Sequence, residues 1–290
     1  MDQPNPFAKR ALFYPLAPGL GKRAAMLFLK ARRGVNAAIC GADAPAARGG
    51  WRMSVYFEEL DFRPTPMGVL SLRQRRSLTS GADIYEIKLG DEYLMSSAFT
   101  SAEIELARLG LAALARADLD VVVGGLGLGY TAVAALENSQ VRSLIVVDAL
   151  AEVIEWHEQG LLPLGQQLTA DPRCRLVHGD FFAMSDSPDG FDSKTPGRCF
   201  DAALVDIDHS PTNLLHPRHA ALYTPGGLAR LAAHLNPGGV FALWSNDPPD
   251  HAFSAVLAGA FATSVAHVVT FDSLQGERDV SNTVYVGVKA

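Results

Sequence analysis

Four aspartates follow short apolar runs, and their side chains could do chemistry. Asp148 ends the run Val141–Val147, Asp180 lies just beyond Leu176 and Val177, and Asp206 and Asp208 come directly after Ala202–Val205. A carboxylate accepts hydrogen bonds from hydroxyl and amino groups and can take a proton from a reacting group. If the apolar runs are neighbouring strands of a parallel sheet, the four carboxylates meet at one edge of that sheet, where such folds bind ligands.

A glycine-rich stretch lies before these acids. Val121-Val-Val-Gly-Gly-Leu-Gly-Leu-Gly-Tyr130 leads into the small residues 131–136, which is typical of a strand, a tight loop and a helix. The helix would point its first N–H groups at a ligand. Asp148, 18 positions after Tyr130, is placed to hold two ribose hydroxyls. The pattern predicts a nucleoside-binding site with Gly125, Gly127 and Gly129 in its loop.

The glycine spacing alone fits two classes of enzyme. Gly125, Gly127 and Gly129 match the G-x-G-x-G of S-adenosylmethionine enzymes, whereas Gly127, Gly129 and Ala132 match the G-x-G-x-x-G/A of dinucleotide enzymes. The acids at the later strand ends favour the first class. Asp180 could accept a hydrogen bond from an adenine amino group, and the sequence offers no second nucleotide-binding half.

The alternating pattern of the chain predicts an α/β fold. We expect seven strands, at 120–124, 142–147, 174–178, 201–206, 238–244, 265–271 and 282–288, the last two forming a hairpin, with helices at 149–160, 226–235 and 251–262. This is the Rossmann-like sheet of class I S-adenosylmethionine-dependent methyltransferases. Short runs at 54–60, 68–73 and 84–89 predict a small antiparallel β-domain before it. The capping-box sequence Thr100-Ser-Ala-Glu103 predicts the start of a helix that continues to Ala117.

Composition and charge narrow the possible partners. Residues 1–52 hold nine basic and two acidic residues and are expected to form a flexible extension, followed by the β-domain at 53–100 and the nucleoside-binding domain at 101–290. The acidic remainder disfavours nucleic acid and would attract a cationic small molecule. No segment is long and apolar enough to cross a membrane. Three scattered cysteines indicate neither a disulfide framework nor a zinc ribbon and favour the cytoplasm.

Several segments together resemble the spermidine synthase family of aminopropyltransferases. They are Asp148–Glu155, Asp171–Asp180, Phe200–Asp206 and Asn236–Val240, in the family's order and at similar separations. The resemblance implies S-adenosylmethionine or its decarboxylated form as co-substrate, no metal, a small amine acceptor and a homodimer. It also implies that Asp206 takes the proton of the attacking amine, while Asp148 binds ribose and Asp180 binds adenine. The family has a second acid three positions after the catalytic one; here that position is His209, and the nearby acid, our second catalytic candidate, is Asp208.

Two departures from the family keep other functions open. Gly127 stands where the family's loop carries an aspartate for the amino group of the decarboxylated co-substrate, and residues 99–108 lack the family's diamine-binding side chains. The alternatives are a small-molecule methyltransferase, a nucleoside-binding protein without catalysis and a nicotinamide-dependent reductase. A metal site formed by His209, His216 and His219 is a further hypothesis, although the spacing of these histidines matches no known motif.

Overall fold

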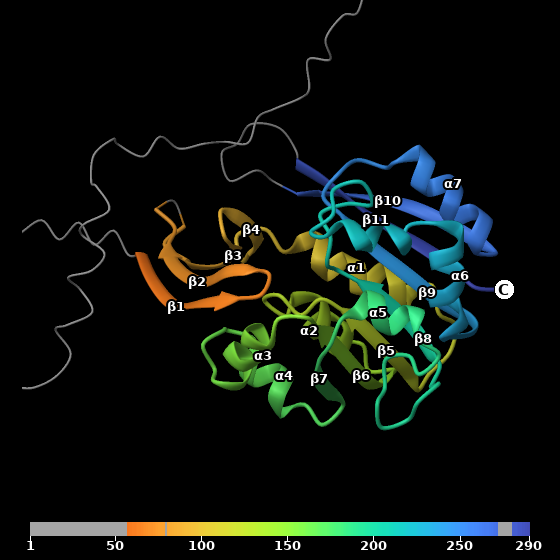
Figure 1. The fold of residues 1–290 in the computed structure, drawn as a ribbon, viewed down its shortest axis with the longest axis horizontal. Coiled ribbons are helices and arrows are strands. Elements are labelled where there is room, and N and C mark those ends of the chain that lie inside the picture. The colour runs from red at the N-terminus through yellow and green to blue at the C-terminus, as the bar shows by residue number, and fades with distance from the viewer. Residues whose placement is uncertain (1–56, 79, 272–279) are drawn as a thin grey trace, which may run out of the picture. The chain divides into compact units, whose positions relative to one another are not determined.

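The computed structural model describes residues 57–78, 80–271 and 280–290 (Figure 1). The predicted basic extension at 1–52 and the boundary at its end lie outside these residues. The elements, in chain order, are β1 (Phe57–Thr65), β2 (Gly68–Arg76), β3 (Asp83–Leu89), β4 (Glu92–Ser96), α1 (Ser101–Ala112), β5 (Leu119–Gly124), α2 (Tyr130–Glu137), β6 (Val141–Asp148), α3 (Ala151–Glu158), α4 (Gly165–Ala170), β7 (Cys174–His178), α5 (Phe181–Asp186), β8 (Phe200–Val205), η2 (Pro217–Ala221), α6 (Pro225–Ala233), β9 (Leu235–Ser245), α7 (His251–Ala260), β10 (Thr263–Phe271) and β11 (Val280–Val288).

Seven strands form the main sheet, in the order β10-β11-β9-β8-β5-β6-β7. Strands β9, β8, β5, β6 and β7 are mutually parallel, while β11 runs antiparallel to both β9 and β10. The α/β fold with seven strands and a terminal hairpin is thus confirmed. Parallel strands need crossover helices, which place the ends of all five strands at one edge of the sheet.

Both faces of this sheet are buried at its centre, in β5 and β8, which explains the unbroken apolar runs there. Val121 and Val123 of β5 belong to an apolar cluster with α1, α2 and α3, whereas Val122 belongs to a second cluster with α5, α6 and α7. Because successive side chains of a strand point to opposite faces, a strand covered on both sides must be apolar throughout. Figure 1 shows the two layers of helices on either side of the sheet.

The four-stranded antiparallel sheet β1-β2-β3-β4 packs against the first of these clusters. Leu70, Leu72 and Ile87 are almost fully buried there. Polar contacts attach the same sheet to α3, because the Trp156 indole Nε1 donates to Asp61 Oδ2 (2.7 Å) and the Arg63 guanidinium pairs with Glu155. The small sheet is therefore fixed beside the strand ends.

The predicted capping box is wrong. Thr100 is the N-cap of α1 but makes no side-chain cap hydrogen bond, and the helix ends at Ala112 instead of Ala117. Glu103 is only 9% exposed, and its carboxyl group bonds to its own backbone N–H. Tertiary burial outweighs the local signal here. Among the described residues, no helix is long and apolar enough to span a membrane.

Candidate functional site

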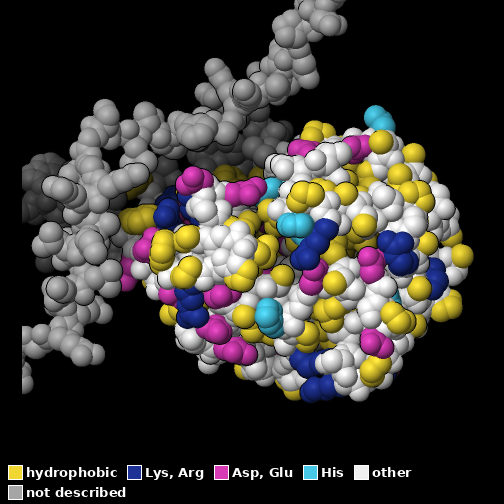
Figure 2. Space-filling model, viewed as in Figure 1, with side chains coloured by type: hydrophobic (Ala, Val, Ile, Leu, Met, Phe, Trp, Pro, Cys, Tyr) yellow, Lys and Arg dark blue, Asp and Glu magenta, His cyan; other side chains and the backbone are white. Residues whose placement is uncertain are grey.

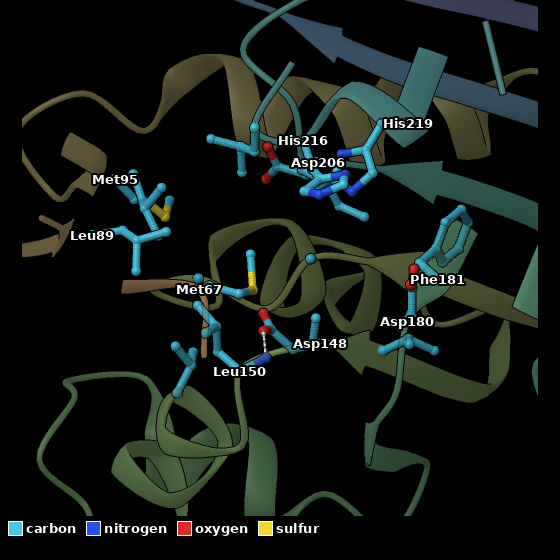
Figure 3. Close-up of a pocket in the computed structure, with 18 of the residues that line it drawn as sticks. Met67, Leu89, Met95, Asp148, Leu150, Asp180, Phe181, Asp206, His216 and His219 are labelled. Carbon is cyan, nitrogen blue, oxygen red and sulfur yellow. Dashed lines mark hydrogen bonds between the residues drawn. The ribbon is translucent and has the colours of Figure 1, made fainter. Parts of the chain in front are cut away.

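A cavity of about 440 Å³ lies at the carboxyl edge of the main sheet, and one of its walls is the small sheet. Residues directly after β5, β6, β7 and β8 line it, together with Trp244 near the end of β9. Figure 3 shows Asp148 and Asp206 on opposite sides of this space, with Met67, Leu89 and Met95 toward one end and Asp180 and Phe181 toward the other. Three of the four predicted aspartates are thus brought together.

The glycine loop packs directly on the end of β8. A Cβ atom at Gly125 would lie 2.0 Å from the Asp206 backbone oxygen, and φ at Gly125 is +93°. Only glycine tolerates both the contact and the left-handed backbone. The need for glycine at this position therefore comes from the chain's own packing.

Asp148, at the end of β6, orders the loop through its carboxylate. Its Oδ2 accepts from the Leu126 N–H and its Oδ1 from the Leu150 N–H, both at 2.8 Å. A carboxylate has about four acceptor positions, so capacity for further donors is left. Burial raises the pKa of Asp148, and hydrogen bonds from the N–H groups of Leu150, Leu126 and Gly127 oppose that rise. The residue is partly exposed to the cavity, as binding of ribose hydroxyls requires.

Met95 of β4 occupies the space beside Gly127. Its sulfur accepts a hydrogen bond from the Leu128 N–H (3.1 Å), and a Cβ atom at Gly127 would come within 2.8 Å of the same sulfur. The loop position that differs from the resembled family thus faces a thioether. Without movement of Met95 there is no room for an aspartate side chain.

His157 of α3 supports the glycine loop through a hydrogen bond. The side chain is fully buried, and its Nε2 lies 2.9 Å from the Gly127 carbonyl oxygen. Since a carbonyl only accepts, Nε2 carries the proton. Nδ1 is buried with no partner among the described residues. Burial lowers the pKa of His157, so the ring is neutral and serves as a structural brace.

Asp180 has both carboxylate oxygens engaged. Oδ1 caps helix α5 by accepting from the N–H groups of Phe182 (3.1 Å) and Ala183 (3.3 Å), and Oδ2 pairs with the Arg218 guanidinium at 2.7 Å. Arg218 is well exposed and also lines the cavity. An adenine amino group would share Oδ2 with Arg218 or displace it.

Asp206 follows β8 and faces the centre of the cavity. The Thr131 hydroxyl donates to its Oδ2 (2.8 Å) and also lies 3.2 Å from the Glu103 carbonyl oxygen. Burial raises the pKa of Asp206 to about 6, against the lowering effect of the Thr131 hydrogen bond. Near neutral pH this carboxylate is ionised and still basic enough to accept a proton, as a general base needs to be.

The structure does not bring Asp208 to the cavity, in contrast to the predicted role beside Asp206. Its side chain is 1% exposed and accepts from the Leu215 N–H, His219 Nδ1 and the Tyr223 hydroxyl, each at 2.8 Å. Because Nδ1 of His219 donates to this carboxylate, Nε2 is its unprotonated nitrogen in the neutral ring. The His219 ring lines the cavity and stacks on Phe182, with centroids 3.7 Å apart. Asp208 thus fixes the orientation of His219.

Glu103 is a cavity residue that the sequence reasoning missed, because its spacing from Thr100 suggested a helix cap. Burial and the neighbouring charge of Asp206 raise the pKa of Glu103 to about 8. Two carboxyl groups that share a poorly solvated space resist carrying two charges at once. Near pH 7 the pair therefore holds one proton and one negative charge.

His209, His216 and His219 lie around the cavity but do not build a metal centre. No group of three or more histidine, cysteine or acidic side chains in the described part of the chain is arranged to hold a metal ion. His209 Nε2 instead lies 2.9 Å from Glu92 Oε1 of β4, which joins the loop after β8 to the small sheet. On the face shown in Figure 2, described Lys and Arg side chains are scattered among acidic and apolar ones.

Comparison with known proteins gives similarity at the level of structure. No family model and no curated protein matches the sequence. A spermidine synthase crystallised in complex with the transition state analogue AdoDATO superposes with a TM-score of 0.60 at 16% identity, over 80% of this chain and 74% of that one. A spermidine synthase from Thermotoga maritima gives 0.60 at 15% identity, over 80% and 73%. The chain has a spermidine synthase-like fold.

Proposed function

We propose that this protein is a transferase that moves an alkyl group from a sulfonium nucleoside to a small acceptor. One observation carries the proposal. The glycine loop, the Asp148 carboxylate that orders it and the basic carboxylate of Asp206 open onto one cavity at the ends of adjacent strands. A sulfonium carries its own leaving group, so a protein that aligns the reactants and accepts a proton supplies what the reaction needs.

The charge of the cavity supports a cationic donor. Its acidic lining residues are Glu103, Asp148, Asp180 and Asp206, while Arg218, paired with Asp180, is its lining arginine. A positive sulfur between the two sides of this space would be attracted by the ionised carboxylates. The fold similarity to spermidine synthases supports an aminopropyl donor, decarboxylated S-adenosylmethionine.

Met95 favours a second candidate, methyl transfer from S-adenosylmethionine. Its sulfur takes the space beside Gly127 where the resembled family places a carboxylate for the amino group of the decarboxylated donor. An aminopropyl group would then lack one ionic partner, and a charged hydrogen bond is worth about 1.5 to 3 kcal/mol. S-adenosylmethionine carries a carboxylate next to its ammonium group, which an aspartate at this position would repel and the uncharged thioether of Met95 does not.

Titration calorimetry with S-adenosylmethionine, its decarboxylated form and NADH tests the class of protein. We expect one of the sulfonium nucleosides to bind and NADH not to bind; tight NADH binding without sulfonium binding would overturn the proposal. Incubation with a mixture of amines followed by mass spectrometry then separates the two candidates, since the product gains either an aminopropyl or a methyl group. Binding of a sulfonium nucleoside without formation of any product would favour the alternative of a nucleoside-binding protein without catalysis.

A further inference from the structure

Glu103 is a buried acid without a basic partner. Its side chain is 9% exposed and lines the cavity, and among the described residues its carboxyl forms no ion pair with a lysine, arginine or histidine. The neighbouring acid of the same helix, Glu105, does pair, with Arg108 at 3.1 Å on the outside of the molecule. Burying a carboxyl group without a partner is costly, so this position is unfavourable for stability alone.

Glu103 and Asp206 belong to one polar unit. Thr131 connects them, since its hydroxyl donates to Asp206 Oδ2 and also lies within hydrogen-bond distance of the Glu103 backbone oxygen. The charge of Asp206 acts directly on Glu103. Burial and, to a lesser extent, Glu103 also raise the pKa of the Tyr130 hydroxyl of α2, which is hydrogen-bonded to Ser97. Both carboxyl groups, one from α1 and one from the end of β8, line the same cavity.

The small sheet contributes only uncharged residues to the same cavity: Pro66, Met67, Ile87, Leu89, Leu94 and Met95. Trp244 and Ile207 of the main sheet edge add further apolar surface. The part of a ligand that extends from the two carboxyl groups toward the small sheet contacts apolar carbon and sulfur atoms. A second ammonium group placed there would be desolvated without an ionic partner, which is strongly unfavourable.

We propose that Glu103 and Asp206 together hold the single amino group of an acceptor whose remaining body is apolar. Under the proposed transfer function, on which this inference rests, the acceptor class is primary alkyl or arylalkyl monoamines instead of diamines. The cavity matches such a molecule at both ends, with two acceptor groups for the nitrogen and an uncharged wall for the chain.

The two carboxyl groups have different tasks in this arrangement. The ionised Asp206 and the carbonyl oxygen of the neutral Glu103 each accept one N–H of the free amine, which leaves the nitrogen lone pair for attack. The lone pair forms a bond to the carbon attached to sulfur, and the C–S bond breaks with its electron pair going to sulfur, giving a thioether. The proton lost by the alkylated nitrogen goes to Asp206. A second ionised carboxylate would instead hold the amine as an unreactive ammonium ion.

The test is calorimetry with 1-aminopentane, 1,5-diaminopentane and 1-pentanol, which share the same chain length. The protein is titrated alone and after saturation with S-adenosylhomocysteine or 5′-methylthioadenosine. We expect 1-aminopentane to bind at least about tenfold more tightly than either of the other two. Equal or tighter binding of the diamine would overturn the inference, as would equal binding of the alcohol.

The matched variants are Glu103→Ala and, as control, Glu105→Ala on the same helix. Glu103→Ala removes both carboxyl oxygens, so we expect about a tenfold loss of 1-aminopentane affinity with nucleoside binding retained. Glu103→Gln keeps a carbonyl acceptor, as the neutral carboxyl group does, and should stay within about threefold of the wild type. Retained nucleoside binding also shows that a variant is folded; if Glu103→Ala loses it, Glu103→Leu takes its place. Glu105→Ala should change neither affinity, and unchanged amine affinity without the Glu103 carboxyl group would contradict the inference.

The outcome distinguishes this inference from the proposed function. Selective amine binding without any sulfonium binding would retain the amine site and reject the transferase. Sulfonium binding without monoamine selectivity would retain the transferase and reject the acceptor class.

Discussion

Asp206 combines a recessed position, a hydrogen bond from Thr131 and a raised pKa. Replacement by asparagine keeps the shape of the side chain but removes its ability to take a proton. We expect Asp206→Asn to lower turnover by about 100-fold or more, which is the usual contribution of a positioned general base. The dissociation constant of the nucleoside should change by less than about threefold. Single-turnover rates and calorimetry measure the two quantities, and unimpaired turnover would remove Asp206 from the mechanism.

The same carboxyl group predicts the pH dependence of the reaction. A general base works in its deprotonated form, and the pKa of Asp206 is about 6. The rate should therefore rise from pH 5 to pH 7 and contain a limb centred near pH 6. This limb is measured as kcat/KM against pH. Its persistence in residual activity of Asp206→Asn would assign the titration to another group.

The acidic residues of the site could be predicted from the sequence, but their hydrogen-bonding and ion-pair partners could not. Strand-end acids at 148, 180 and 206 line the cavity because parallel strands end at a common edge. Asp208 follows the same local pattern and turns away to bind His219. Glu103 carried a local capping signal that long-range burial overrides. Local spacing cannot distinguish such cases, because the deciding contacts come from segments far away in the chain.

At the scale of elements, strands were easier to predict than short helices. The central strands β5, β6 and β8 of the main sheet are largely buried apolar runs, so their boundaries follow from composition. Helices α4 and α5 have six residues each, too few to show a helical period, and β4 has five, with partly exposed side chains. These short elements nevertheless shape the cavity, since Met95 comes from β4 and Phe181 and Phe182 from α5.

Helix α7 and helix α1 give a matched test of capping. Asp250 caps α7 by accepting from the N–H groups of Ala252 (2.7 Å) and Phe253 (3.0 Å), whereas Thr100 makes no side-chain cap bond. Asp250→Ala should therefore lower the free energy of unfolding by about 1 kcal/mol, and Thr100→Ala by less than about 0.5 kcal/mol. Urea denaturation compares them. Similar losses in both variants would mean that Thr100 caps α1 in solution.

The contact between β4 and the glycine loop predicts an energetic coupling. Gly127→Ala adds a Cβ atom 2.8 Å from the Met95 sulfur at a φ of +47° and should cost at least about 1 kcal/mol. Met95→Ala removes the collision but not the backbone strain. The double variant should therefore be more stable than the sum of the two single losses by about 0.5 kcal/mol or more. Simple additivity in a denaturation cycle would show that the loop and β4 do not touch.

For the whole molecule, the buried pair of acids predicts that stability falls as the pH rises. The pKa of Glu103 is about 8 in the folded chain and near its ordinary value of 4.5 in the unfolded chain. Between these values the folded state holds a proton that the unfolded state has lost. Each pH unit of increase in that window lowers the free energy of unfolding by up to about 1.4 kcal/mol, and this decrease ends above pH 8.

Glu103→Gln cannot ionise and should lack this dependence. Thermal unfolding is measured from pH 6.5 to pH 8.5. The melting temperature of the variant should rise relative to that of the wild type as the pH rises. Because the pKa of His157 is lowered in the folded state, this residue destabilises the fold as the pH falls below about 6.5. His157 is present in both proteins, so its effect cancels in the comparison. Parallel pH dependences would show that Glu103 is ionised in the folded protein.

The position of the small sheet in the sequence has a consequence for how proteins of this fold diversify. Its apolar lining side chains all come from residues 66–95, before the first strand of the main sheet begins, whereas the glycine loop and the strand-end acids come later in the chain. Under the proposed function, the wall that meets the apolar body of the acceptor is thus encoded before the glycine loop and the strand-end acids. Exchange of β1–β4 between proteins of this architecture would alter that wall, together with the Met95 contact to the loop, while Glu103 and the strand-end acids are inherited unchanged.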